Sequence, residues 1–164
     1  MTDLNSKKLL VDSRTLTVPV GASEAFRAIT SIGGDNGWYA WNWLWKLRGL
    51  LDVLVGGVGM RRSAAREAPL EIGDEVDFWR VVQLEPDRRL RLKAEMILPG
   101  EAWLEFEIGG GAPATTITQT ATFAPKGLLG RLYWYSVLPL HELVFRGMLH
   151  GIARAAQKPY RSQP

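Results

Sequence analysis

The stretch KGLLGRLYWYSVLPLHELVFRGMLHGIARAAQ, residues 126–157, decides how the rest of this chain can fold. Pro139 divides it into an aromatic segment, 127–135, and the strongest helix signal in the sequence, 140–157. Proline fits the first position of a helix, where a missing N–H costs no hydrogen bond, so we expect the helix to begin there. At about 100° per residue, most apolar side chains of 140–157 share one wide arc, and the polar ones lie opposite. The stretch therefore predicts a long amphipathic C-terminal helix with a broad buried face.

Two glycines and one histidine interrupt the apolar face of this helix. His141 lies near the middle of the face, and Gly147 and Gly151 lie at its edge, one turn apart. Glycine inside a helix costs about 1 kcal/mol relative to alanine, so we expect another segment to come close there, or space to be left empty. His141 is either a core histidine with satisfied hydrogen bonds or an acid–base or hydrogen-bonding group at the end of a cavity.

The middle of the chain alternates apolar and polar residues, as half-buried antiparallel strands do. We predict a strand in each of four segments, 73–84, 90–98, 103–108 and 115–123, joined by short links. The glycines of 109–111 are the expected turn before the last of them.

The first part of the chain predicts one more strand and a short helix. Residues 1–12 have the character of a loosely ordered start, and 14–20 alternates like a strand. A helix opens within 21–26, with Ser23 as its expected cap.

A tryptophan cluster leads into a second helix, which passes through 44–55 and ends at the glycines of 56–59. Together with Arg61 and Arg62, these glycines could also cradle a phosphate, but they end a helix rather than begin one, which favours a simple helix stop. The aromatic side chains are expected in a cavity wall or in plain core, with membrane-surface contact as a third reading. The cluster consists of Trp38, Trp41, Trp43 and Trp45.

The predicted order is strand, two helices, several meandering strands and a long terminal helix, which is an α+β fold. One long helix cannot cover a strongly curved sheet evenly, so a cavity is expected between them. This arrangement resembles the helix-grip fold of the START-like (SRPBCC) superfamily, which includes polyketide cyclases and plant lipid-binding proteins. The resemblance implies a curved antiparallel sheet wrapped around the C-terminal helix.

Motifs that point to one family are spread over most of the chain, at 43–45, 48–52, 56–59, 73–74, 77–81, 94–96, 99–104, 119–121 and 127–141. In these motifs the chain resembles a bacterial domain of unknown function that is usually found as the C-terminal half of SDR-like, NAD(P)H-binding proteins. The sequence contains no Gly-x-Gly-x-x-Gly after a first strand, so we expect no cofactor and no NAD(P)H binding by this chain alone. One alternative that follows from the resemblance is a separate SDR-type protein as a partner.

Composition narrows the function further. A chain of 164 residues suits one domain, 1–164, and a net charge of +3 with interspersed signs argues against a nucleic-acid surface. There is no cysteine, and the two histidines, His141 and His150, lie on opposite sides of one helix, so we expect no metal site. The N-terminus does not read as a signal peptide, and no apolar run is long enough to span a membrane. We therefore expect a cytoplasmic bacterial protein with no stable membrane insertion.

The function we expect is binding of a small, largely apolar ligand in the cavity between the sheet and the C-terminal helix. Gln119 falls on the inward face of its strand, where a buried amide without partners costs about 1–3 kcal/mol, so it either orients a ligand or pairs with nearby groups. Whether Arg80 or Trp79 faces the cavity stays open. The expected wall residues are Trp43, Phe78, Met96, Leu104, Phe106, Phe145 and Met148, and the expected orienting residues are Gln119, Tyr135 and His141.

Two alternatives remain. The protein could be a cyclase- or hydrolase-like enzyme that uses His141 with a carboxylate, for which Glu95 and Glu101 lie nearest the expected cavity mouth. It could also be a non-catalytic partner domain of a separate SDR-type oxidoreductase.

Overall fold

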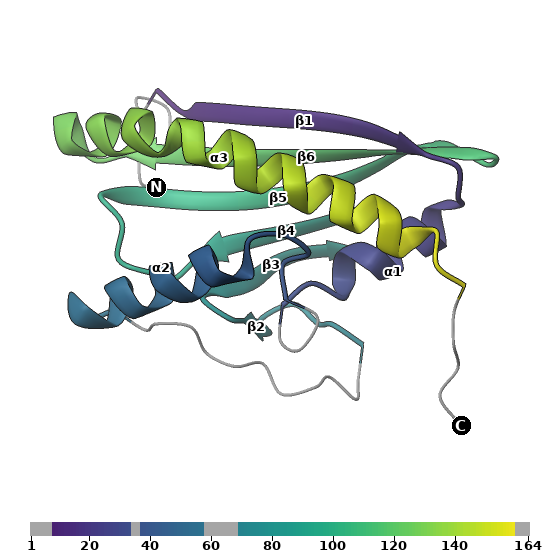
Figure 1. Cartoon of the computed structure of the whole chain (residues 1–164), viewed down its shortest axis with the longest axis horizontal. Helices are drawn as coiled ribbons and strands as arrows, with labels where there is room; N and C mark the ends of the chain where they lie inside the picture. Colours follow the sequence, from purple (N-terminus) through teal and green to yellow (C-terminus); the bar gives the residue numbers. More distant parts are fainter. Residues whose placement is uncertain (1–7, 34–36, 58–68, 160–164) are drawn as a thin grey trace, which may run out of the picture.

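The computed structural model describes residues 8–33, 37–57 and 69–159 and contains one six-stranded antiparallel sheet in the order β1-β6-β5-β4-β3-β2. Three helices accompany it in this part of the chain (Figure 1). The elements are β1 (Leu10–Val18), α1 (Ala22–Thr30), α2 (Asn42–Leu54), β2 (Glu75–Val76), β3 (Trp79–Glu85), β4 (Arg89–Ala94), β5 (Gly100–Gly111), β6 (Ala114–Pro125) and α3 (Gly127–Ala156).

The long helix α3 lies along one face of the sheet, with α1 beneath its C-terminal half and α2 near its N-terminal half (Figure 1). Strand alternation sets the inner face: on β6, Ile117, Gln119, Ala121 and Phe123 are buried, and the threonines between them are not. Neighbouring β5 presents Leu104 and Phe106 to the same side, opposite Ala121 and Gln119. The chain has the helix-grip architecture that the sequence predicted.

The terminal helix is longer than predicted, because α3 begins at Gly127 and continues through Pro139 without ending. A proline inside a helix leaves the carbonyl four residues earlier, here that of Tyr135, without its intrahelical hydrogen bond. The side chains of Pro139 and Tyr135 are both exposed, so solvent can hydrate that carbonyl. The prediction that the helix begins at Pro139 is therefore wrong.

Two predictions about the start of the chain are also wrong. Strand β1 begins at Leu10, inside the segment expected to be loose, because nine residues of β1 pair in register with β6. Ser23 does not cap α1: Gly21 occupies that position, and the Ser23 hydroxyl donates to Asp87 at 3.0 Å instead.

The segment 73–84 is two strands rather than one. β2 and β3 pair antiparallel through a tight turn at Asp77 and Phe78, where Asp77 has φ +55°. The Trp38 indole N–H donates to the buried Asp77 carboxylate at 2.7 Å, which holds this turn. The reversal places Trp79 inward and leaves Arg80 half-exposed, which resolves the choice that the sequence left open.

The remaining boundaries differ by a few residues. β4 ends at Ala94 rather than at residue 98. The expected turn at 109–111 lies within β5, and the chain reverses after it, between Gly111 and Ala114.

The sequence left two possibilities for the helical glycines, a close neighbour or empty space, and the structure shows a close neighbour. A Cβ on Gly151 would lie 2.3 Å from the Cβ of Tyr39, and one on Gly147 would lie 2.9 Å from the Cβ of Ala40. The neighbour is the segment before α2, rather than the sheet or the cavity.

Candidate ligand pocket

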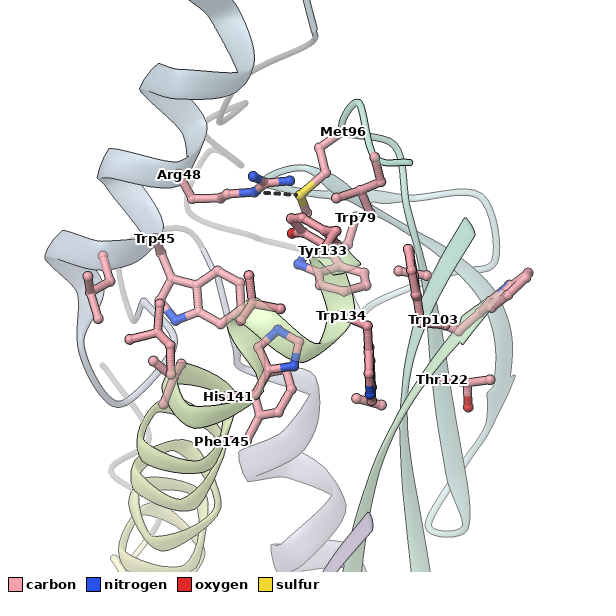
Figure 2. Close-up of a pocket in the computed structure, with 18 of the residues that line it drawn as sticks. Trp45, Arg48, Trp79, Met96, Trp103, Thr122, Tyr133, Trp134, His141 and Phe145 are labelled. Carbon is pink, nitrogen blue, oxygen red and sulfur yellow. Dashed lines mark hydrogen bonds between the residues drawn. The ribbon is translucent and has the colours of Figure 1, made fainter. Parts of the chain in front are cut away.

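A pocket of about 290 Å³ lies between α2, the N-terminal half of α3 and the nearby end of the sheet (Figure 2). A single water needs roughly 10–15 Å³ of such space, so the hollow is far larger than a few waters. The expected cavity therefore exists, at the N-terminal half of α3. Its walls are Leu44, Trp45, Leu47, Arg48 and Leu51 of α2; Trp79, Met96, Leu98, Ala102, Trp103, Ala121, Thr122 and Phe123 of the sheet and its links; and Tyr133, Trp134, Val137, Leu140, His141, Val144 and Phe145 of α3.

Aromatic rings form most of the walls and hold one another in place. Trp45 stacks on Trp38 with centroids 5.0 Å apart and on Phe78 at 5.6 Å. On the opposite side, Trp134 stacks on Phe123 at 5.8 Å with the ring planes 7° apart. Such rings supply large apolar faces that suit flat or apolar molecules.

Few polar groups reach the pocket. The Arg48 side chain donates to the Met96 sulfur at 3.4 Å and lies over the Tyr133 ring, 5.6 Å from its centroid (Figure 2). Burial raises the pKa of Tyr133, although Arg48 opposes the shift, so the phenol is neutral at pH 7.

His141 is the most informative of these polar groups. Its ring lies 4.8 Å from Phe145 and meets the Trp134 ring edge-on at 5.5 Å (Figure 2). Its Nδ1 is buried, and within the described residues it has no hydrogen-bond partner. The pKa of His141 is lowered to about 4, chiefly because burial desolvates the ring. The charges of Arg14 and Arg48 add to this shift, and the charge of Asp12 opposes it. At pH 7 the ring is therefore neutral, with an unused hydrogen-bonding atom.

A set of polar residues lies beside the pocket: Asp12 and Arg14, partly buried on the inner face of β1, the buried Gln119 of β6 and the exposed Glu142 of α3. Arg14 forms ion pairs with Asp12 at 2.8 Å and with Glu142 of α3 at 2.6 Å, and its guanidinium lies 5.9 Å from the centre of the Phe145 ring. Gln119 is opposite Arg14 in the strand register, is 1% exposed, and has neither side-chain atom hydrogen-bonded within the described residues. Gln119 is thus inward as predicted, but it is not among the residues that line the pocket.

Sequence reasoning missed Asp12 and Arg14 as neighbours of the site. The signal was the alternation of β1: counting back from the buried Val18 by twos reaches Arg14 and Asp12 on the inner face. Asp12 lies in the segment 1–12 that was expected to be loosely ordered, whereas Arg14 is the first residue of the predicted strand 14–20.

The predicted site residues fall into three groups. Met96, His141 and Phe145 line the pocket. Two predictions are wrong because the side chains are exposed, Trp43 by 60% and Tyr135 by 61%. The others are buried in the core but do not line the pocket: Phe78, Leu104, Phe106, Gln119 and Met148.

Several wall residues were not predicted as such. The tryptophan cluster is expected in a cavity wall or in core, with Trp43 as the wall residue, but Trp45 lines the pocket instead, because the local pattern does not show which face of α2 turns inward. Trp134 lies before Pro139, outside the predicted helix, so no helical face is predicted for it. The helical period of 3.6, extended back from His141, places Trp134 two turns earlier on the same side.

The other candidate groups are engaged elsewhere. Glu95 pairs with Arg80, and Lys93 bonds Glu101 at 2.9 Å, so neither carboxylate lines the pocket. Gly56 has φ +86° and follows the last turn of α2, which confirms the helix stop. Residues 58–62, the rest of the suggested phosphate cradle, lie outside the described residues. No three His, Asp or Glu side chains within 8–33, 37–57 and 69–159 gather as metal ligands would.

Family comparison identifies the chain. The model of a family described as "Protein of unknown function (DUF2867)" matches residues 6–148. The chain belongs to this family. No curated protein matches its sequence. The family description carries no activity, so function must be argued from the pocket.

Solved structures share the fold at low sequence identity. Zhui aromatase/cyclase from Streptomyces sp. R1128 is 14% identical, with a TM-score of 0.55 over 94% of this chain and 98% of that one. Norcoclaurine synthase from Thalictrum flavum, in complex with dopamine and hydroxybenzaldehyde, is 12% identical, with a TM-score of 0.52 over 94% and 91%. DynU16, from the dynemicin biosynthetic locus, is 19% identical with a TM-score of 0.52; the match covers 88% of this chain but only 46% of that one. These likenesses support the helix-grip fold.

Proposed function

We propose that this protein binds a small, largely apolar molecule with a flat or aromatic body in the pocket between α2, α3 and the sheet. The observation that carries the proposal is a 290 Å³ hollow walled by aromatic rings, with the neutral ring of His141 in its wall. Ligand sites are typically apolar hollows of about 300–1,000 Å³ with a few placed polar groups. The volume here lies just below that range, so the ligand is small.

The polar groups suggest how the ligand is oriented. A neutral imidazole offers one donor and one acceptor, so the His141 ring would bond a hydroxyl, carbonyl or amine of the ligand. Two small aromatic molecules occupy the norcoclaurine synthase structure, which supports aromatic ligands for this fold.

Titration with a fluorescent apolar probe, 8-anilinonaphthalene-1-sulfonate, and competition by planar aromatic compounds test the proposal. Val137 lines the pocket, whereas Leu143 on the same helix is 48% exposed and does not. Val137→Trp should weaken probe binding about tenfold or more by filling the space, while Leu143→Trp should leave it unchanged. Equal binding by both variants and the parent would place the probe elsewhere and remove the support for a ligand site here.

Catalysis through His141 is the second candidate, favoured by the placement of its ring in the pocket. A base with a pKa of about 4 is a weak proton acceptor at pH 7, and both predicted carboxylate partners are held by basic residues. Ligand binding is therefore the stronger proposal. Turnover of a bound compound that His141→Ala abolishes, with affinity retained, would instead establish an enzyme.

The proposals of an SDR-type partner and of a cytoplasmic location rest on the sequence alone. A stoichiometric complex with such a partner would support the first. Among the described helices, none combines the length and apolarity that crossing a membrane would require.

A further inference from the structure

One end of the molecule carries an unusual density of exposed aliphatic side chains. We call it the apolar end. All of its members are between 49% and 75% exposed. They are Leu50, Leu51, Val53, Leu54 and Val55 from the end of α2, Ile97 from the β4–β5 link, and Leu128, Leu129 and Leu132 from the first turns of α3.

Three segments distant in sequence are fastened together at this end. The Ile97 backbone N–H donates to the buried Asp52 carboxylate of α2 at 2.7 Å. The Lys126 N–H donates to the Pro99 carbonyl at 2.9 Å, and a Cβ on Gly130 would lie 2.4 Å from that same oxygen. Figure 1 shows the C-terminal end of α2 and the first turns of α3 at the same end of the molecule, on its left. The exposed side chains therefore belong to one region.

The exposed charged side chains on α2 and at the start of α3 are all basic. Lys46, Lys126 and Arg131 are exposed and Arg48 is half-buried. The acid of α2, Asp52, is 3% exposed and bonded to Ile97, and the first acid of α3 is Glu142, beyond this region. Of the acids near the β4–β5 link, Glu95 is paired with Arg80 and Glu101 with Lys93.

This combination selects one kind of partner. A second copy of the chain would bring like charges together, which disfavours a symmetric dimer through this end. Aliphatic side chains ringed by Lys and Arg suit the boundary between acyl chains and anionic headgroups, where interfacial helices bind. Leu51 belongs both to the apolar end and to the pocket wall, so the pocket lies next to this surface.

We propose that the apolar end docks reversibly on the surface of a lipid bilayer containing anionic lipids. Leu128, Leu129 and Leu54 reach the acyl boundary, and Lys126 and Arg131 face the headgroups. The docking is peripheral and needs no spanning helix. It does not depend on what the pocket binds, so it can fail or succeed separately from the proposed function.

Vesicle co-sedimentation tests the proposal directly. The protein should sediment with vesicles of phosphatidylcholine and phosphatidylglycerol, less with phosphatidylcholine alone, and less as salt is raised. Leu128→Glu with Leu129→Glu should reduce the bound fraction about tenfold, because charges are costly at the acyl boundary. Ile72→Glu is the matched control, since Ile72 is 66% exposed but lies outside the apolar end. Thermal melts and probe binding without vesicles check that each variant is folded with its pocket intact.

The proposal is overturned if the parent does not bind anionic vesicles, or if the double variant binds them as well as the parent does. Analytical ultracentrifugation supplies a further check. If the parent is a dimer, the double variant is a monomer and the parent does not bind vesicles, the apolar end is the interface with a second copy instead. Capture of an SDR-type protein in place of vesicles would assign it to that partner.

Discussion

The two halves of α3 lie against the rest of the molecule in opposite ways. Six of the ten buried residues of this helix fall between Met148 and Ala156, where it packs closely. Between Tyr133 and Phe145 the same helix lines an open pocket. One element therefore closes one end of the fold and leaves the other end hollow.

Side-chain size explains the difference. Gly147 and Gly151 let the segment before α2 approach the helix backbone, and a Cβ at either position would meet it at under 3.0 Å. At the other half, the rings of Trp134 and Tyr133 meet those of the sheet and hold the surfaces apart. Gly147 and Gly151 thus mark where another segment packs closely against the helix, rather than where the cavity lies.

The largest effect should come from Gly151→Leu, at the tight half. Its Cβ would lie 2.3 Å from the Tyr39 Cβ and 3.0 Å from the Tyr39 carbonyl oxygen, so backbone must move. Overpacking of this kind should cost about 3 kcal/mol or more, well above the gain of about 1 kcal/mol from removing a helical glycine. Urea denaturation measures the change. The exposed Arg154→Leu on the same helix should melt like the parent, and equal stability of both variants would contradict the tight packing.

Substitution of one alanine in each half by leucine compares how tightly the two halves are packed. Ala156 is 2% exposed in the packed half, and Ala156→Leu should lower the free energy of unfolding by about 3 kcal/mol. Ala121 lines the pocket, so Ala121→Leu has space to enter and should change stability by less than about 1 kcal/mol while weakening probe binding. Denaturation measures the change in the free energy of unfolding, and fluorescence titration measures the change in probe binding. Similar destabilisation by the two substitutions would mean that the pocket half is as tightly packed as the other.

The smallest expected effect concerns pH. The folded protein keeps His141 neutral down to about pH 4, whereas the unfolded chain protonates this histidine near its ordinary pKa of 6.5. The unfolded state therefore binds more protons between these values, and stability is lost as pH falls through that window. Between pH 7 and pH 5 the loss should be about 2 kcal/mol.

Denaturation series at the two pH values can isolate this contribution. His141→Leu should remove that part of the pH dependence, and substitution of the exposed His150 by Gln should retain it. A His141→Leu profile parallel to that of the parent would show that the ring is hydrated rather than buried in the pocket wall.

Much of the fold could be predicted from the sequence because periodicity reports which side of an element is buried. The alternation of β6 placed Gln119 inside, and the arc of α3 placed Phe145 and Met148 inside, as the structure has them. Gly147 and Gly151 indicated either a close neighbour or an empty space, because helix propensity disfavours glycine there, but the sequence did not decide between the two. Strand alternation and the apolar arc of a helix depend only on residues that are close in sequence.

Only the tertiary structure decided which end is hollow and which residues line it. Burial on the inner face made Phe106, Met148 and Phe145 look equivalent, yet only Phe145 reaches the pocket, because α2 stands beside that half of α3. The position of α2 depends on contacts such as the one from Ile97 to Asp52, 45 residues apart in sequence. A turn at Asp77 and Phe78, held by Trp38, likewise set Trp79 inward and Arg80 outward. Local pattern determines whether a side chain is covered, whereas the distance between covering surfaces depends on every element packed between them.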